Sequence, residues 1–294
     1  MIGKIVKGVG GFYYVHLRPF DVVYECKAKG IFRKLGIRPV VGDDCEIEIL
    51  DESLKTGNIV SIVERKNVLI RPAVANCEQA VILFALTKPA PNFNLLDRFL
   101  INMMQQNVHT AICFNKADLA EGEDTELIGA AYRKAGYECL FISAKEKTGD
   151  LDALRSLIAG KTTVLAGPSG VGKSTLLNLL APGAMAQTGE ISEKIGRGKH
   201  TTRHTELISA GEGSYILDTP GFSSLLVENL EAEELKDYYT EFSSYAPDCR
   251  FNGCNHLSEP DCAVKQALEK GEISTLRYEN YKLLYDELNS RRKW

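Results

Sequence analysis

The sequence predicts a multidomain protein in which a small β-barrel precedes a doubly wound α/β domain and a helical C-terminal segment. Short β-rich runs separated by turn signals fill residues 1–66, apolar runs alternate with helical stretches over 79–221, and the pattern turns helical after about residue 228. With 294 residues, 44% of them hydrophobic, the chain can build a core in each part. We expect domains at 1–66, 67–228 and 229–294.

The N-terminal part is predicted to be a small antiparallel barrel, and its pattern is compatible with an OB-fold. Residues 1–40 carry eight basic and two acidic side chains, a net charge of +6, together with Phe12, Tyr13 and Tyr14. OB-folds bind oligonucleotides through phosphate contacts and base stacking. Packed aromatic residues beside a solvated charged surface are an equally good interpretation of this segment alone.

Composition limits the possible classes of protein. The formal net charge of −4 argues against general coating of nucleic acid, so any RNA contact must come from local basic surfaces. We expect a cytoplasmic protein without membrane association, because no run of about 18 apolar residues and no apolar signal region occur. Five of the eight cysteines are scattered and are expected to be reduced core residues.

A phosphate-binding loop is predicted between a strand and a helix. Residues Gly167–Ser174 have the form Gly-x-x-x-x-Gly-Lys-Ser, after the strand Thr162–Ala166 and before the helix Thr175–Leu180. Its glycines let backbone N–H groups surround phosphates, Lys173 neutralises the β- and γ-phosphates, and the Ser174 hydroxyl binds Mg²⁺. The expected nucleotide contacts here are Gly167, Pro168, Ser169, Gly170, Val171, Gly172, Lys173, Ser174 and Thr175.

Two loops after consecutive strands predict recognition of guanine. Asn115-Lys116-Ala117-Asp118 follows the first strand, and the Asp118 carboxylate can accept both donors on the guanine edge, which adenine lacks. This favours GTP over ATP. We expect Asn115 to tie this loop to the phosphate loop and Lys116 to lie along the base plane. After the next strand, Ser143, Ala144 and Lys145 offer a backbone N–H to guanine O6.

Two further segments suit the γ-phosphate and its metal ion. Asp218-Thr219-Pro220-Gly221 follows a strand, so Asp218 is expected to hold a Mg²⁺-bound water and the Gly221 N–H to sense the γ-phosphate. A plain turn after a strand is the alternative. In the basic loop 196–203, either Thr201 or Thr202 can complete the Mg²⁺ shell.

The order of these motifs is unusual. The guanine motifs precede the phosphate loop, whereas in ordinary GTPases they follow it, and residues 222–294 hold no second Asn-Lys-x-Asp. A permutation preserves strand contacts when the original termini lie close together. The sequence therefore predicts a circularly permuted P-loop GTPase domain whose Asp218–Gly221 motif lies close to its C-terminal end.

The residue that orients the attacking water is less evident. Phe222 follows the Asp218–Gly221 motif and has no group that can orient water. His200 is our candidate, because a neutral imidazole beside the threonines can accept a proton from water. A solvated or RNA-contacting histidine is the alternative, and His204 is a weaker candidate.

A metal site is predicted in the C-terminal part. Cys249, Cys254, His256 and Cys262 supply three thiolates and one imidazole within fourteen residues, a set that fits tetrahedral zinc. Four protein ligands leave no open position for catalysis. We therefore expect one structural Zn²⁺ that stabilises a segment without a core of its own.

With these motifs in this order, the chain resembles the RsgA (YjeQ/YloQ) family of bacterial GTPases of small-ribosomal-subunit maturation. The match also includes His200-Thr201-Thr202, Cys262–Lys265 and Arg277-Tyr278. The resemblance implies an N-terminal OB-fold, contact with 16S rRNA on the 30S subunit, GTP hydrolysis accelerated by that particle, and release after hydrolysis. We also expect a monomer.

Two other functions stay open at this point. One is a nucleotide-gated binding module whose hydrolysis is incidental, and the other is a metal- or membrane-associated GTPase without RNA. GTP turnover measured with and without purified 30S subunits distinguishes both from the ribosomal interpretation.

Overall fold

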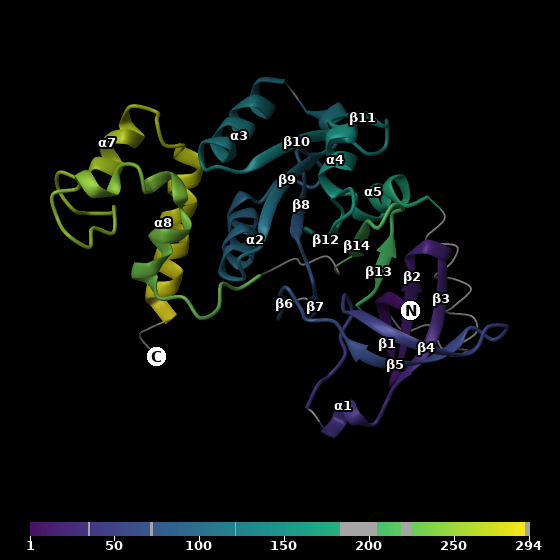
Figure 1. Cartoon of the computed structure of the whole chain (residues 1–294). Coiled ribbons are helices and arrows are strands. Elements are labelled where there is room, and N and C mark those ends of the chain that lie inside the picture. The colour runs from purple at the N-terminus through teal and green to yellow at the C-terminus, as the bar shows by residue number, and fades with distance from the viewer. Residues whose placement is uncertain (35, 71–72, 121, 183–204, 219–224, 292–294) are drawn as a thin grey trace. The chain divides into compact units, whose positions relative to one another are not determined.

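The computed structural model describes residues 1–34, 36–70, 73–120, 122–182, 205–218 and 225–291 (Figure 1). The chain forms two compact units. The first contains Met1–Val81, Leu151–Ala166 and Gly172–Gly221, and the second contains Ile82–Asp150, Gly167–Val171 and Phe222–Trp294.

The first unit begins with a closed five-stranded barrel, which confirms the predicted N-terminal fold. Its strands follow the order β1-β2-β3-β5-β4, and only β3 and β5 pair in parallel. The strands are β1 (Ile2–Val9), β2 (Phe12–Leu17), β3 (Val22–Ala28), β4 (Asp44–Asp51) and β5 (Thr56–Ile62), with the short helices η1 (Arg18–Phe20) and α1 (Ile31–Lys34). Alternate side chains point inward and form the barrel core, including Ile5, Val15, Leu17, Cys26, Cys45, Ile47 and Ile59.

The rest of the first unit supplies strands and helices of the α/β part. The strand β12 (Thr162–Ala166) lies between the helices α4 (Leu151–Ile158) and α5 (Lys173–Leu180). It pairs in parallel with β14 (Tyr215–Asp218), which pairs antiparallel with β13 (Leu207–Ser209). A separate two-stranded sheet consists of β6 (Val68–Leu69) and β7 (Val74–Ala75).

Within the first unit, the barrel contacts β14 and the residue that precedes β13. His16 Nδ1 lies 2.8 Å from the Tyr215 hydroxyl, and the Lys7 ammonium pairs with Glu206 at 3.0 Å. The barrel is thereby joined to β14, which ends at Asp218.

The second unit carries the other half of the α/β pattern. In sequence order it contains most of β8 (Gln79–Ala85), then α2 (Phe93–Gln105), β9 (His109–Asn115), η2 (Ala117–Leu119), α3 (Gly122–Lys134), β10 (Glu138–Ser143) and β11 (Thr148–Gly149). The sheet has the strand order β11-β10-β9-β8-β12-β14-β13, and the boundary between the units lies within β8. Every residue of β8 is buried, as expected of a central strand covered on both faces.

The predicted sheet was parallel, and its two edges depart from that prediction. The edge strands β11 and β13 both pair antiparallel with their neighbours. They have two and three residues, so neither carries enough alternating side chains to be recognised from the sequence.

The C-terminal part is helical, as predicted, although its first turns are 3₁₀ helices. They are η3 (Ala232–Tyr238), η4 (Thr240–Phe242) and η5 (Ala246–Asp248), followed by α7 (Ala263–Glu269) and α8 (Thr275–Arg291). Their core includes the aromatic side chains of Tyr239, Phe242, Tyr278 and Tyr281, and Ile101 of α2 joins the same cluster. Among the described residues, no helix combines the length and apolar character needed to cross a membrane.

Candidate nucleotide site and metal centre

Asn115 connects three loops within the second unit. Its Nδ2 donates to the carbonyl of Val171 at 2.8 Å, and its Oδ1 accepts from the N–H of Ala144 at 2.9 Å. The side chain is buried at the end of β9. The Asn115 amide therefore links the Asn115–Asp118 loop to the Ser143–Lys145 loop and to the phosphate loop at Val171. A buried amide is stable only where its donor and its acceptor are both satisfied, so these contacts fix the arrangement of the three loops.

Lys116 strengthens the same arrangement. Its backbone adopts a left-handed conformation with φ of 63°, and its ammonium donates to the carbonyl of Gly170 at 2.9 Å and to that of Lys88. Asp118 lies in the short helix η2 that follows. The Ser143 hydroxyl accepts from the N–H of Glu146 at 3.1 Å and closes the turn that contains Lys145.

Gly167 begins the phosphate loop where no side chain fits. Its φ is 153°, and a Cβ would lie 2.1 Å from the carbonyl oxygen of Leu83 on β8. Gly172 ends the loop in a left-handed conformation, with φ of 100°, as the N-cap of α5. Any residue with a side chain at Gly167 would have to displace β8, which is why a glycine is required there.

The first unit holds the charged residues predicted to face the phosphates. Lys173 is the first residue of α5, and Asp218 is the last residue of β14. Burial lowers the pKa of Lys173, and the Asp218 carboxylate acts in the opposite direction. Ser174 and Thr175 follow on the first turn of α5. His200, Thr201, Thr202 and Gly221, as well as His204 and Phe222, lie outside the described residues.

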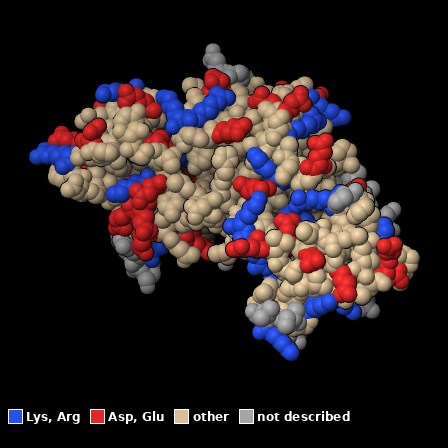
Figure 2. Space-filling view, viewed as in Figure 1, with Lys and Arg blue, Asp and Glu red and all other residues tan. Residues whose placement is uncertain are grey.

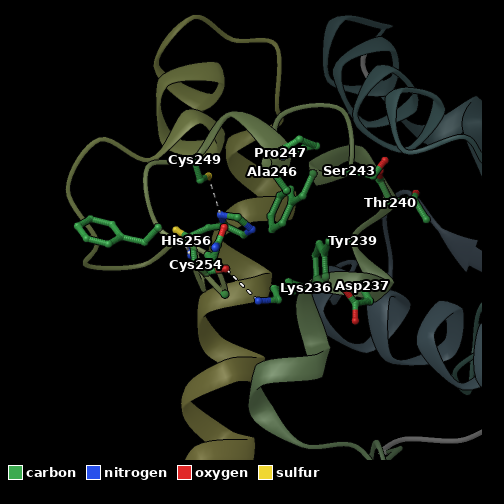
Figure 3. Close-up of a pocket in the computed structure, with 14 residues that line it drawn as sticks. Lys236, Asp237, Tyr239, Thr240, Ser243, Ala246, Pro247, Cys249, Cys254 and His256 are labelled. Atoms are coloured by element: carbon green, nitrogen blue, oxygen red, sulfur yellow. Dashed lines mark hydrogen bonds between the residues drawn. The ribbon is translucent and has the colours of Figure 1, made fainter.

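The four predicted metal ligands converge in the second unit. The ligand atoms of Cys249, Cys254, His256 and Cys262 all lie within 4.8 Å of one another, so the cluster could hold a metal ion. Cys249 Sγ lies 3.6 Å from His256 Nδ1 and 3.8 Å from Cys262 Sγ. Figure 3 shows Cys249, Cys254 and His256 together at the edge of a pocket of about 320 Å³.

Burial favours the uncharged forms of the ligand side chains in this cluster. Burial raises the pKa of the Cys254 thiol to about 12, and it also raises the pKa of Cys262. Burial lowers the pKa of His256 and so favours the neutral imidazole that metals bind. A divalent cation would convert these buried thiols to thiolates.

Side chains from outside the cysteine loop hold it in place. The Tyr278 and Tyr281 hydroxyls on α8 donate to the carbonyls of His256 and Asn255, each at 2.6 Å. Lys236 donates to the carbonyl of Cys254 at 3.1 Å, as Figure 3 also shows. The sequence identified the ligands from their spacing, whereas it assigned no supporting role to Tyr278, Tyr281 or Lys236.

The basic surface of the barrel is smaller than its composition indicates. Residues 41–66 carry seven acidic and three basic side chains, which offset much of the +6 of residues 1–40. Lys4 and Arg18 both pair with Asp44, and Lys29 pairs with Glu48. On the face in Figure 2, basic and acidic side chains are interspersed over the barrel. Lys27, whose ammonium lies 5.0 Å from the centre of the Phe12 ring, keeps the combination of charge and aromatic surface that single-stranded nucleic acid prefers.

The fold and the order of its loops define a P-loop GTPase with circularly permuted motifs. Family models of the RsgA N-terminal domain and the RsgA GTPase match residues 2–59 and 62–228. The chain therefore belongs to the RsgA family of GTPases.

Relatives and solved structures agree with this assignment. The protein named small ribosomal subunit biogenesis GTPase RsgA from Agathobacter rectalis is 52% identical over 100% of both chains, and that from Alkaliphilus metalliredigens is 49% identical over 99% of both. The crystal structure of YloQ, described as a circularly permuted GTPase, has 39% identity and a TM-score of 0.77 over 99% of this chain and 95% of its own. YjeQ from Thermotoga maritima has 33% identity and a TM-score of 0.78 over 98% of both chains.

Proposed function

We propose that this protein is a GTPase that binds the small ribosomal subunit through 16S rRNA and acts late in its maturation, with GTP hydrolysis timing its release. The proposal of GTP binding rests on the contacts of Asn115, which fix the Asn115–Asp118 and Ser143–Lys145 loops against the phosphate loop. The ribosomal part is supported by the names of the curated relatives, which match over their full length.

In this proposal each loop has one task. Asp118 accepts the two guanine donors, and a backbone N–H of the Ser143–Lys145 loop other than that of Ala144, which already donates to Asn115, reads O6. The backbone of Gly167–Thr175 surrounds the phosphates, while Lys173 neutralises their charge. Ser174 and either Thr201 or Thr202 bind Mg²⁺, with Asp218 holding one of its waters. His200 orients the attacking water, and Gly221 senses the γ-phosphate.

The metal of the cysteine cluster is proposed to be a single structural Zn²⁺. Tetrahedral zinc, with bonds of about 2.3 Å to sulfur and about 2.0 Å to nitrogen, separates its donor atoms by roughly 3.5–3.8 Å. The distances from Cys249 to His256 and Cys262 fall in this range. All four positions are taken by the protein, so the ion would stabilise the loop and take no part in hydrolysis.

The same proposal includes the domain limits, the role of the barrel and the location of the protein in the cell. We propose domain limits at 1–66, 67–228 and 229–294, with the barrel meeting rRNA through the surface around Lys27 and Phe12. The protein would act as a monomer in the cytoplasm, where the subunit is assembled.

The decisive experiment measures GTP turnover with and without purified 30S subunits. Strong stimulation, together with co-sedimentation in the presence of a GTP analogue and release with GDP, is the expected result. GTP turnover that is the same with and without 30S subunits, in the absence of binding to them, would favour a GTPase of another process. Nucleotide-dependent binding to the subunit without stimulated turnover would favour a binding module.

A further inference from the structure

The four side chains of the cysteine cluster differ in how easily solvent reaches them. Cys249 is partly exposed, whereas Cys254 is 5% exposed and Cys262 and His256 are each 2% exposed. Cys249 also lines the pocket of about 320 Å³ in Figure 3, and Cys262 is not among the described residues around that pocket. A small solute therefore reaches the sulfur of Cys249 before the other three side chains.

Cys262 is placed to pair with Cys249. Their Sγ atoms lie 3.8 Å apart. The residues next to them already join the two chain segments, because the Arg250 N–H donates to the carbonyl of Asp261 at 3.4 Å and the Arg250 guanidinium pairs with the Asp261 carboxylate at 2.7 Å. The sulfurs of a disulfide are about 2.05 Å apart, so a movement of less than about 2 Å would bring the two sulfurs into bonding distance.

Cys254 faces the same pocket but is more enclosed. Its Sγ accepts the N–H of His256 at 3.4 Å, and its carbonyl accepts from the Lys236 ammonium at 3.1 Å. Susceptibility of a cysteine to oxidation follows the exposure of its sulfur. Cys249 is therefore expected to react before Cys254.

We propose that Cys249 is an oxidation site, at which hydrogen peroxide starts the formation of a disulfide with Cys262. The Cys249 thiolate attacks one peroxide oxygen, so an S–O bond forms, the O–O bond breaks and hydroxide leaves. The Cys262 thiolate then attacks the Cys249 sulfur of this sulfenic acid, and a second hydroxide leaves as the S–S bond forms. The two thiolates lose two electrons in total, and the peroxide gains both.

This disulfide removes two of the four metal ligands, so the ion is released and residues 249–262 loosen. The inference rests on the proposed structural Zn²⁺ and on the proposed binding to the small subunit. None of the four ligands lies in the nucleotide loops, so GTP binding persists in the oxidised protein. Peroxide would thus withdraw the protein from the subunit reversibly, because a reductant and zinc restore the cluster.

The test uses the full-length protein purified with its zinc and treated with hydrogen peroxide. A chromogenic chelator follows zinc release, and mass spectrometry of peptides locates the disulfide and the first sulfenic acid, trapped with dimedone. Cys249→His and Cys262→His each keep four ligands, because two cysteines and two histidines also form a zinc site. Cys139→Ala is the matched control, since Cys139 is a buried thiol outside the cluster.

We expect wild type to release its zinc together with formation of the disulfide between Cys249 and Cys262, and dithiothreitol with added zinc to reverse both. Cys249→His should release zinc at least about 10-fold more slowly, whereas Cys262→His should accumulate sulfenic acid at Cys249 without a disulfide. Cys139→Ala should behave as wild type. A first sulfenic acid at Cys254 or Cys262, or zinc release without the disulfide in wild type, would overturn the proposal whether or not the histidine variants bind zinc.

Metal analysis before treatment separates this inference from the functions on which it rests. A chain that purifies without zinc refutes both the structural zinc and the oxidation site. A zinc-loaded chain whose cluster resists peroxide refutes the oxidation site alone. GTP turnover of the untreated protein with 30S subunits decides the ribosomal function independently.

Discussion

Arg277 on α8 and Asp97 on α2 form an ion pair of 2.5 Å in which both side chains are almost completely buried. Glu241 pairs with the same guanidinium at 2.8 Å, and Asn280 and the Tyr239 hydroxyl donate to Asp97. These five side chains come from α2, α8 and the turns between residues 239 and 242. The pair therefore fastens the C-terminal helix to a helix of the nucleotide-binding part.

Replacing Arg277 should destabilise the protein strongly. Arg277→Met leaves the buried carboxylates of Asp97 and Glu241 without their cation, and we expect a loss of about 3–5 kcal/mol in the free energy of unfolding at neutral pH. Urea denaturation measures this directly. Lys282→Ala on the same helix should change stability by no more than about 1 kcal/mol, because its ion pair is exposed. A loss below 1 kcal/mol for Arg277→Met would contradict the importance of the pair.

The loss of unfolding free energy in Arg277→Met should depend on pH. Burial raises the pKa of Asp97, and the Arg277 charge opposes this rise. Without the arginine the folded-state pKa rises further above the unfolded value, so the folded variant gains stability relative to wild type as the pH falls and Asp97 takes up a proton. The stability difference between Arg277→Met and wild type should therefore shrink between pH 7 and pH 5. An unchanged or growing difference would mean that Asp97 is not the group left unpaired.

Asp118→Asn should change the base that the protein prefers. An amide cannot accept both guanine donors, but it can pair with the xanthine edge, so affinity for GTP should fall by at least about 100-fold while affinity for XTP rises. Competition binding with the two nucleotides gives the ratio. Asn115→Ala is expected to weaken both nucleotides alike, because it removes the junction between loops. Unchanged GTP affinity in Asp118→Asn would refute the assignment of the base loop.

Loss of the metal should affect the C-terminal part alone. Cys254→Ala, or treatment with a chelator, is expected to loosen residues 249–262 and to weaken 30S binding, while GTP binding stays close to wild type. Metal analysis should find one zinc per chain in the wild type. Cys139→Ala, at a cysteine outside the cluster, should retain the metal. A wild-type protein that purifies without stoichiometric zinc would end this prediction.

His200→Ala tests the catalytic assignment. If His200 orients the water, turnover in the presence of 30S subunits should fall by on the order of 10²–10⁴, with nucleotide affinity near wild type. Single-turnover hydrolysis and subunit binding are measured on the same preparation. Near-normal turnover would move the role to His204 or to the ribosome, and a parallel loss of 30S binding would favour an RNA contact.

The parts of this protein that sequence reveals are those whose chemistry lies within a few residues. The Asn115–Asp118 loop, the Gly167–Ser174 loop and the cysteine cluster are local patterns, and the strands before the first two are apolar runs. The groups that were missed act across long separations. Asp97 meets Arg277 only because two distant helices pack together, and the Tyr278 and Tyr281 hydroxyls bind carbonyls that lie 22 and 26 residues away in the sequence.

Charge on the barrel was overestimated for a related reason. A net charge of +6 over residues 1–40 says nothing about which acidic side chains an adjacent strand will bring alongside. Pairing of β1 with β4 places Asp44 within reach of Lys4 and Arg18. Only the register of the closed barrel reveals that these cations are neutralised.

The separation of 180 residues between Asp97 and Arg277 also matters while the chain is being made. Helix α2 leaves the ribosome early, and its buried carboxylate has no cation until the last helix has been synthesised. Chain growth at about 5–20 residues per second leaves that interval at roughly ten seconds or more. During this time the face of α2 that carries Asp97 must stay hydrated or covered. The second unit therefore completes its fold only when synthesis is almost finished, even if its nucleotide loops form earlier.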